Sequence, residues 1–506
     1  MTGWVGRLLN LFRLVGVMNR PIRRLGILVA IMFVAIMAST TITQFVMANE
    51  LNENARNVRA LYREFGNKRG PIVASGQTLA ESVPVDSPFR FLRTYSHDDP
   101  ELAAIFAPVT GFFSIANGTN MLERTENSYL NGTADELWFN RLRDLFTATE
   151  PQGSSVETTI DYDTQIAAWN ALGNQQGAVV AIEVRTGRIL ALVSKPSYDP
   201  NVLAVHSTGN AGAAYQALVA DPTDPLINRA INALYPPGST FKLIPAIAAL
   251  ETGKVTPNQL IPAPRTFTLP GTTHALQNFG GAACSPANEM TLHDAMVISC
   301  NTAFANLGVE LGGDAMRATA ERFGFNSPWE VPMRVSTSNF PTEMSRDQFG
   351  LAGIGQGDVT ATPLQMAVVV AAIANNGVVM QPYLVDTIRD DQLETVVANE
   401  PRELRSAMSP STARLLTEMM VDTVDHGTGT AARIPGITVA GKTGTAQTAA
   451  GVAPHAWFVA FAPAENPEIA VAVVVERGGD LASEATGGRV AAPIARRVIE
   501  AYLDEG

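Results

Sequence analysis

Ser239 and Lys242 are the two residues of this chain whose types and spacing most directly suggest covalent chemistry. A serine hydroxyl is a weak nucleophile until a base takes its proton, and a neutral lysine amine can be that base. Positions i and i+3 share one face of a helix, so the amine of Lys242 can reach the hydroxyl of Ser239. The structural alternative is a serine that caps a helix beside a surface lysine.

Lysine is scarce in this chain, which gives the position of Lys242 more weight. Of the 36 Lys and Arg residues only five are lysine, and only one of these five follows a serine by three positions. Arginine cannot lose its proton at accessible pH, whereas a buried lysine near another cation can. We therefore expect Ser239 as nucleophile and Lys242 as base at the start of an apolar helix over residues 239–250, which Pro245 should loosen.

Ser299-Cys300-Asn301 is the only S-x-N sequence of the chain. It interrupts two apolar segments, residues 292–298 and 302–307, and so predicts a loop between two helices. Ser299 could relay a proton, and the Asn301 amide could hold a peptide carbonyl. The structural alternative is an ordinary helix cap.

Lys442-Thr443-Gly444-Thr445 lies on a predicted strand over residues 438–445. Alternate residues of a strand share a face, so Thr443 and Thr445 can bind one carboxylate. Gly444 lacks a side chain and would let a substrate backbone lie against the strand. Lys442 can add positive charge and depress the pKa of Lys242. The alternative is a β-turn with a surface lysine.

The three motifs each occur once and in this order, and as a set they resemble the signature of the penicillin-binding proteins and serine β-lactamases. The set implies Ser239, Lys242, Ser299, Asn301 and Lys442 as catalytic residues, with Thr443, Gly444 and Thr445 binding substrate. Further segments resemble the class B group, and most of all its actinobacterial penicillin-binding protein A subgroup: Arg69-Gly-Pro-Ile72, Gly111-Phe-Phe-Ser114, Gly355-Gln-Gly357, Gly427-Thr-Gly429 and Ala456-Trp-Phe458. One departure is Ala74-Ser75, which replaces the usual Asp-Arg pair.

The resemblance implies a substrate, a peptidoglycan stem peptide that ends in D-Ala-D-Ala. Ser239 would form an acyl-enzyme with release of D-Ala, and the amine of a second stem would resolve it into a cross-link, in cell wall synthesis, division or shape. The backbone N–H groups of Ser239 and Thr445 would hold the oxyanion. β-Lactams would acylate the same serine and dissociate slowly.

Three other functions are compatible with parts of this pattern. A D,D-carboxypeptidase would use the same residues with water as acceptor. A non-catalytic cell-wall scaffold would keep the fold, although the intact motifs argue against it. A β-lactamase with a Glu-activated water carries an E-x-x-x-N stretch in its active site, and we cannot assign such a stretch here.

The elements that must position these motifs predict an α+β fold. Residues 178–182 and 189–193 read as a β-hairpin, and residues 438–445, 457–461 and 469–476 as three further strands. Helical stretches dominate after the hairpin to about residue 377, and a helix over residues 490–503 closes the chain. Strands at both ends with helices between them fit one mixed sheet flanked by helices.

Residues 25–48 contain no charged side chain, and a helix of that length spans about 36 Å, enough to cross a bilayer. Five arginines and no acidic residue precede it, which places residues 1–24 in the cytoplasm and the catalytic part outside the cell membrane. A cleaved signal peptide, the alternative, has a shorter apolar core. We expect a small strand-containing pedestal over residues 49–155 and the transpeptidase domain over residues 156–506.

Composition limits the partners and cofactors. The net charge of −12 argues against nucleic acid, and the six histidines show no metal-binding spacing, so we expect no metal and no cofactor. Cys284 and Cys300 either form a disulfide that tethers the S-x-N loop or remain free thiols. Since no glycosyltransferase segment is evident, a separate membrane glycan polymerase is the expected partner.

Overall fold

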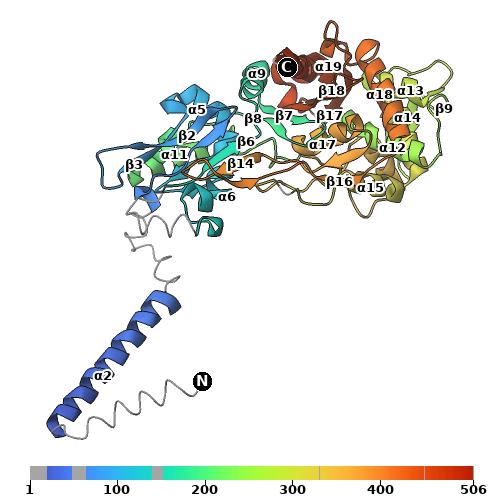
Figure 1. Cartoon of the computed structure of the whole chain (residues 1–506). Coiled ribbons are helices and arrows are strands. Elements are labelled where there is room, and N and C mark those ends of the chain that lie inside the picture. Colours follow the sequence, from blue (N-terminus) through green and yellow to red (C-terminus); the bar gives the residue numbers. More distant parts are fainter. Residues whose placement is uncertain (1–19, 48–63, 139–151, 330, 449–450, 505–506) are drawn as a thin grey trace. The chain divides into compact units, whose positions relative to one another are not determined.

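The structure is a computed structural model that describes residues 20–47, 64–138, 152–329, 331–448 and 451–504 (Figure 1). The chain divides into two compact units, Met1–Gly66 and Asn67–Gly506. The second unit carries all three sequence motifs.

One long apolar helix forms the described part of the first unit. Helix α2 covers Arg20–Thr41 and continues as a π-helical turn, η1, over Ile42–Val46. Three threonine hydroxyls near this transition, those of Thr40, Thr41 and Thr43, bond back to carbonyls four residues earlier, an arrangement that often bends helices.

The 25 residues Ile22–Val46 are long and apolar enough to cross a membrane. Helix α2 begins at Arg20, five residues before the predicted start at residue 25. The prediction counted only uncharged residues, whereas Arg20, Arg23 and Arg24 are also helical. The predicted end at residue 48, and Arg7 and Arg13 of the basic segment, lie outside the described residues.

A five-stranded sheet organises the second unit. Its strands are β7 (Gly177–Glu183), β8 (Ile189–Lys195), β17 (Ala440–Ala446), β18 (His455–Ala462) and β19 (Ile469–Val475). Their order is β17-β18-β19-β7-β8, so the first and last strands of the sequence lie side by side (Figure 1). The predicted hairpin and the three C-terminal strands are confirmed.

All pairings in this sheet are antiparallel, so the expectation of a mixed sheet is wrong here. Hairpins join β7 to β8, β17 to β18 and β18 to β19, and the long region between β8 and β17 carries the chain from one edge of the sheet to the other. Strand β17, which carries the K-T-G motif, is an edge strand.

Helices cover both faces of the sheet. Helix α9 (Tyr162–Leu172) and the closing helix α19 (Gly487–Asp504) pack on one face. Helices α12 (Leu243–Glu251) and α17 (Pro363–Ala374) belong to the core on the other face. Both faces are therefore buried, which explains why the strands read as nearly continuous apolar runs.

The region between the two groups of strands contains further helices. Helices α14 (Asn301–Leu311), α15 (Gly313–Arg322) and α18 (Pro410–Asp425) contact α12, whereas α10 (Asn201–Ala204) and α11 (Thr208–Ala220) pack with each other and α10 contacts β3. The others are α13 (Leu292–Val297) and α16 (Arg346–Ala352). Helices do not dominate throughout, because strands also lie in this region, among them four of three residues each: β9 (Leu260–Pro262), β10 (Thr266–Thr268), β11 (Ala275–Gln277) and β12 (Glu289–Thr291). They form two small hairpin-like pairs beside α14.

A second, six-stranded sheet has the order β15-β14-β6-β1-β2-β3. It is built from β1 (Ile72–Ala74), β2 (Gln77–Pro84), β3 (Phe91–Tyr95), β6 (Ser155–Thr158), β14 (Val385–Arg389) and β15 (Thr395–Ala398). This sheet is the mixed one, since β1 and β6 run parallel. The predicted domain boundary after residue 155 falls at β6, and strands from both sides of it complete the sheet.

The N-terminal part of this unit also holds helices and one small hairpin. They are α5 (Pro100–Thr110), α6 (Met121–Thr125), α7 (Asn127–Leu130) and the pair β4 (Phe113–Ser114) and β5 (Gly118–Thr119). Glu123 lies fully buried there between the guanidinium groups of Arg69 and Arg93, with 2.6 Å from Nε to carboxylate oxygen in each pair. The remaining pairing is β13 (Val378–Met380) with β16 (Glu403–Ser406).

Candidate active site

Ser239 lies in a 3₁₀ turn, Gly238–Lys242, that leads directly into α12. The predicted single helix over residues 239–250 is therefore split, and the irregularity precedes Pro245, which falls in the first turn of α12 where its missing N–H costs little. In a 3₁₀ helix the side chains at positions i and i+3 eclipse each other, so Ser239 and Lys242 still lie on the same side of the turn, as predicted.

The turn is held against the K-T-G strand by close backbone packing. Gly238 has a φ of +54°, and a Cβ at this position would lie 2.9 Å from the carbonyl oxygen of Thr445. Its N–H donates to the carbonyl of Gly355 at 2.9 Å, where the Gly355-Gln-Gly357 segment passes. Ser239 itself is half-buried, and within the described part of the chain its hydroxyl forms no hydrogen bond. The hydroxyl is thus available to a ligand.

Lys242 is completely buried beside the S-x-N loop. Its Nζ lies 2.7 Å from the carbonyl oxygen of Ser299, 2.8 Å from Oδ1 of Asn301 and 3.2 Å from Oγ of Ser299. Nζ also lies 5.5 Å from the centroid of the Phe304 ring. A neutral Lys242 amine can donate its two protons to the carbonyl of Ser299 and to Oδ1 of Asn301. Its lone pair is then free to accept a proton from a serine hydroxyl.

Ser299 connects the two buried lysines. The Nζ of Lys442, which is also fully buried, donates to the same Ser299 hydroxyl at 2.8 Å and to the carbonyl of Thr443 at 3.2 Å. The hydroxyl of Ser299 is therefore within hydrogen-bond distance of both amines, and the three groups form a continuous path for a proton.

Burial sets the protonation of these amines. Burial, reinforced by the charge of Lys442, holds the pKa of Lys242 well below its usual range. Burial also lowers the pKa of Lys442, to about 7. The oxygen acceptors around Lys242 favour its ammonium form, but two cations sharing one buried hydroxyl repel each other. Both causes favour the neutral form of Lys242.

The S-x-N loop lies between α13 and α14, as predicted. Ser299 has a φ of +61°, a left-handed conformation that is uncommon for a residue other than glycine. In this conformation both its carbonyl and its hydroxyl contact Lys242. The surrounding contacts must stabilise this backbone.

Three contacts join the loop to the segment that precedes Cys284. A disulfide links Cys284 to Cys300, with a Cα–Cα distance of 6.0 Å. The buried Asn278 accepts a hydrogen bond from the N–H of Thr302 at 3.0 Å through Oδ1, and so caps α14 from outside the helix. The Asn301 amide donates to the carbonyl of Gln277 at 3.3 Å, which turns its oxygen toward Lys242.

The K-T-G strand packs closely against the nucleophile turn at Gly444. A Cβ on Gly444 would lie 2.9 Å from Cγ2 of Thr240 and 3.1 Å from the carbonyl oxygen of Pro237. The missing side chain thus makes room for the nucleophile turn, and the binding of a substrate backbone at Gly444 stays a prediction. Thr445 is half-buried, whereas Thr443 is buried.

Sequence reasoning missed a polar group that supports the chain just before Ser239. The indole of Trp457 donates to the carbonyl of Pro236 at 3.1 Å. The hydroxyl of Tyr235 donates to Glu476 at 2.6 Å, and Arg229 donates to the same carboxylate oxygen at 2.9 Å. The sequence resemblance includes Ala456-Trp-Phe458, but nothing in the spacing of Arg229 and Glu476 marks them as neighbours.

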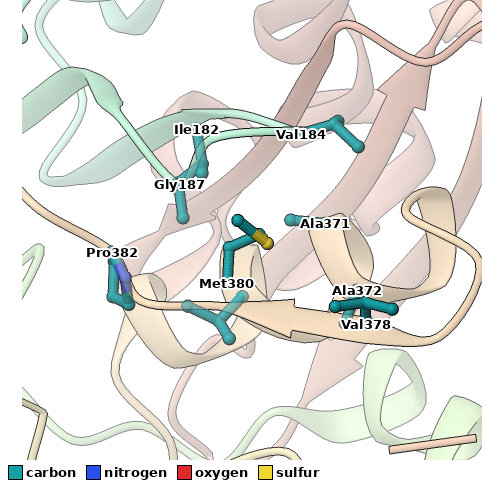
Figure 2. Close-up of a pocket in the computed structure, with 9 residues that line it drawn as sticks. Ile182, Val184, Gly187, Ala371, Ala372, Val378, Met380 and Pro382 are labelled. Carbon is teal, nitrogen blue, oxygen red and sulfur yellow. The ribbon is translucent and has the colours of Figure 1, made fainter. Parts of the chain in front are cut away.

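A small apolar pocket lies elsewhere, and none of the motif residues lines it (Figure 2). It is enclosed by the turn end of the β7–β8 hairpin, by α17 and by β13, through the residues Ile182, Val184, Gly187, Val368, Ala371, Ala372, Val378, Met380 and Pro382. Since this lining has no titratable side chain, the pocket has no catalytic groups of its own.

The fold and the site together are those of a serine acyltransferase. An accessible hydroxyl, a buried amine that has no carboxylate partner within the described part of the chain, and an edge strand beside them can form and break an ester bond. All five predicted catalytic residues lie around the contact between the 3₁₀ turn, the S-x-N loop and β17.

Comparison with known proteins agrees with this class. Residues 177–500 match the penicillin binding protein transpeptidase domain, and residues 69–156 match the penicillin binding protein A dimerisation domain. The peptidoglycan D,D-transpeptidase PbpA of Mycolicibacterium smegmatis is 45% identical over 498 residues, which cover 97% of this chain and 100% of the relative. Its counterpart in Mycobacterium tuberculosis strain H37Rv is 45% identical over 495 residues, covering 96% and 99%.

A solved structure of penicillin-binding protein A from M. tuberculosis, as its ceftriaxone acyl-enzyme complex, superposes with a TM-score of 0.84 at 45% identity. The superposition covers 87% of this chain and all of the solved one. The chain therefore belongs to the penicillin-binding protein transpeptidase family. It is a peptidoglycan D,D-transpeptidase, and the expected class B resemblance to the penicillin-binding protein A group is confirmed.

Proposed function

We propose that Ser239 is the nucleophile of this transpeptidase and that Lys242 is its base. The observation that carries the proposal is the buried path Lys242–Ser299–Lys442, in which one serine hydroxyl lies 3.2 Å from one amine and 2.8 Å from the other. No carboxylate of the described residues pairs with Lys242 and would hold its proton, and burial favours its neutral form.

The substrate is a stem peptide that ends in D-Ala-D-Ala. Ser239 Oγ attacks the carbonyl of the penultimate D-Ala while Lys242 takes the hydroxyl proton. Lys242 gives this proton to Ser299, and Ser299 passes its own to the departing amine, so that free D-Ala leaves and an ester remains on Ser239. The amine of a second stem then attacks the ester, the new amide forms the cross-link, and the proton returns to Ser239.

The oxyanion of each tetrahedral intermediate is held by backbone N–H groups of Ser239 and Thr445. Because β17 is an edge strand, one side of its backbone has no partner strand in the sheet. Gly238 brings the nucleophile turn against Thr445, which places the two N–H groups on neighbouring segments.

β-Lactams acylate the same serine. The relative from M. tuberculosis has been solved as acyl-enzyme complexes with ceftriaxone, imipenem and penicillin G. The test is labelling with a fluorescent penicillin, followed by mass spectrometry of the labelled peptide. Wild type should carry the label on Ser239, and Ser239→Ala should carry none; equal labelling of the two proteins would remove Ser239 from this role.

Product analysis with two defined stems tests the acceptor. A transpeptidase yields a dimeric, cross-linked product, whereas a carboxypeptidase yields a stem shortened by one D-Ala. Trimmed stem as the sole product, in the presence of a competent acceptor amine, would contradict the proposal.

We further propose that residues 1–24 face the cytoplasm and that the catalytic part lies outside the membrane. Arg20, Arg23 and Arg24 at the start of α2 favour this orientation. The Cys284–Cys300 disulfide fits an oxidising, extracytoplasmic compartment. Protease added to intact spheroplasts should digest the catalytic part, and full protection of that part would contradict this orientation.

In this proposal residues 49–155 form a pedestal and residues 156–506 form the transpeptidase domain. A separate membrane glycan polymerase supplies the glycan chains whose stem peptides are cross-linked. Purified protein given lipid-linked precursor alone should make no glycan polymer, and cross-links should appear once a polymerase is added. Polymer formed by the purified protein alone would contradict the need for such a partner.

A further inference from the structure

The turn Gly427-Thr428-Gly429 follows α18 and contacts the K-T-G strand. The hydroxyl of Thr428 lies 2.6 Å from the hydroxyl of Thr443. Thr428 is exposed, whereas Thr443 is only 6% exposed. A ligand that reaches Thr443 therefore meets Thr428 as well.

Three elements hold this turn in place. A Cβ on Gly427 would lie 2.4 Å from the carbonyl oxygen of Val297, the last residue of α13 before the S-x-N loop. A Cβ on Gly488, in the first turn of α19, would lie 2.2 Å from the carbonyl oxygen of Thr428. The backbone of Thr428 is thus packed between α13 and α19, and its hydroxyl has a fixed position relative to β17.

Counting protons shows what the two hydroxyls can do. Each hydroxyl has one proton and two acceptor positions, and the bond between them uses one of the two protons. Among the described residues neither hydroxyl has another hydrogen-bond partner. One proton of the pair is left for an external acceptor, and the bond within the pair polarises it.

The charges around the pair favour an anion. Lys442, adjacent in β17, keeps its proton when Lys242 is neutral. The first turn of α19 also lies against the strand, since a Cβ on Gly487 would be 2.9 Å from the N atom of Gly444. The N-terminal end of a helix carries partial positive charge, which stabilises a nearby carboxylate.

We propose that Thr428 is a binding residue for the carboxylate of the acyl donor, as the exposed member of a hydroxyl pair with Thr443. The inference rests on the proposed function, since the carboxylate in question is that of the terminal D-Ala or of a β-lactam. It assigns a role to Thr428 beyond the three motifs.

The test compares two probes on the same protein sample: benzylpenicillin, which carries the carboxylate, and its methyl ester, which does not. The measured quantity is the ratio of their second-order acylation rate constants, which does not depend on how much of the sample is folded. Thr428→Val keeps the shape of the side chain and removes the hydroxyl. It should lower the ratio by about 3- to 10-fold, the effect of one lost hydrogen bond.

Two variants make the result specific. Thr428→Ser keeps the hydroxyl and should restore the ratio. Thr430 lies two residues after Thr428, is exposed, and forms no side-chain hydrogen bond with the described residues. Thr430→Val should therefore leave the ratio unchanged. The loss in Thr428→Val should fall on the binding constant of the non-covalent complex rather than on the acylation step.

An unchanged ratio in Thr428→Val, no recovery in Thr428→Ser, or an equal loss in Thr430→Val would overturn the inference. These outcomes are separate from failure of the proposed function, which would appear as labelling of Ser239→Ala. Normal labelling of Ser239 together with an unchanged ratio would refute the role of Thr428 alone.

Discussion

Two lysine amines on either side of one serine hydroxyl determine the chemistry of this site. Both amines are buried, and neither has a carboxylate within salt-bridge distance among the described residues. Burial disfavours the charged form of each, and the second charge disfavours it further. Both effects favour the neutral form of Lys242, the form that the proposed role as base requires.

Replacing Lys442 by glutamine should shift the pH dependence of acylation. A lysine must be neutral to act as base, so the wild-type rate rises as pH passes upward through the lowered pKa of Lys242. Without the neighbouring cation this pKa rises, and the ascending limb should move to higher pH by about one unit. The measurement is the second-order rate constant of penicillin acylation against pH.

The amplitude of the Lys442→Gln profile will also fall, because the hydrogen bond to Ser299 is lost. The pH at which the acylation rate rises is a separate quantity. If this pH is the same in Lys442→Gln and wild type, Lys442 does not influence the pKa of Lys242. Lys254→Gln, a change at an exposed lysine outside the site, is the matched control.

At the scale of elements, the site depends on how the S-x-N loop is attached. The disulfide, the Asn278 cap on α14 and the Asn301–Gln277 hydrogen bond all join the loop to residues 277–284. The left-handed backbone of Ser299 is held by these contacts. Loosening the attachment should therefore affect catalysis as well as stability.

Reduction of the disulfide should lower both the melting temperature and the acylation rate. The two cysteines are 16 residues apart, and closing a loop of that size stabilises a fold by about 3 kcal/mol in the chain-entropy model. Thermal unfolding and penicillin acylation are measured with and without reductant. A double variant, Cys284→Ser with Cys300→Ser, should resemble the reduced protein and should not respond to reductant; a response would trace the effect to something else.

The pedestal contains a second buried charged cluster, with Glu123 between Arg69 and Arg93. Burial alone would raise the pKa of Glu123, but the charges of Arg93 and Arg69 outweigh it and lower the pKa. A carboxylate with a lowered pKa stabilises the fold above its unfolded value of about 4.3, and this contribution disappears as the pH falls through the folded pKa.

Glu123→Gln should therefore destabilise the protein by about 3–5 kcal/mol at neutral pH, because two buried guanidinium groups lose their counter-charge. The free energy of unfolding is measured by denaturant titration at several pH values. The difference between variant and wild type should shrink toward low pH. Since the cluster is remote in sequence from all three motifs, the acylation rate of the folded fraction should change little; a large loss would show that the cluster also supports the active site.

At the scale of the whole molecule, the chain consists of one apolar helix unit and one unit that carries all of the chemistry. The second unit, Asn67–Gly506, contains both large sheets and every residue assigned to the site. Its six-stranded sheet joins β1–β3 to β14 and β15, so the pedestal sheet depends on strands more than 200 residues away.

Removal of residues 1–66 should give a soluble protein with an unchanged acylation rate. The deleted unit contributes no residue to the site, and the remaining unit keeps all pairings of both sheets. Sedimentation and penicillin labelling of the shortened protein test this. A shortened protein that folds but is acylated slowly would mean that the first unit contributes to the active state.

The sequence predicted the local parts of this protein well. The S-x-N loop, the K-T-G strand, the β7–β8 hairpin and the closing helix follow from short-range periodicity and turn residues. The chemical expectation for Ser239 and Lys242 likewise came from residue type and spacing. The prediction that the five-stranded sheet is mixed was wrong, because the direction of a strand depends on how distant segments dock and not on the pattern within the strand.

Other features were decided only by the tertiary structure. The packing of Thr240 against Gly444, the Thr428–Thr443 pair and the Tyr235–Glu476–Arg229 group join residues that are remote in sequence, and no local pattern encodes such contacts. The sequence by itself determined which reaction is possible, because it contains the S-x-x-K, S-x-N and K-T-G motifs in that order. The fold decided the protonation of the lysines, because the depth of burial and the distance between two charges exist only in three dimensions.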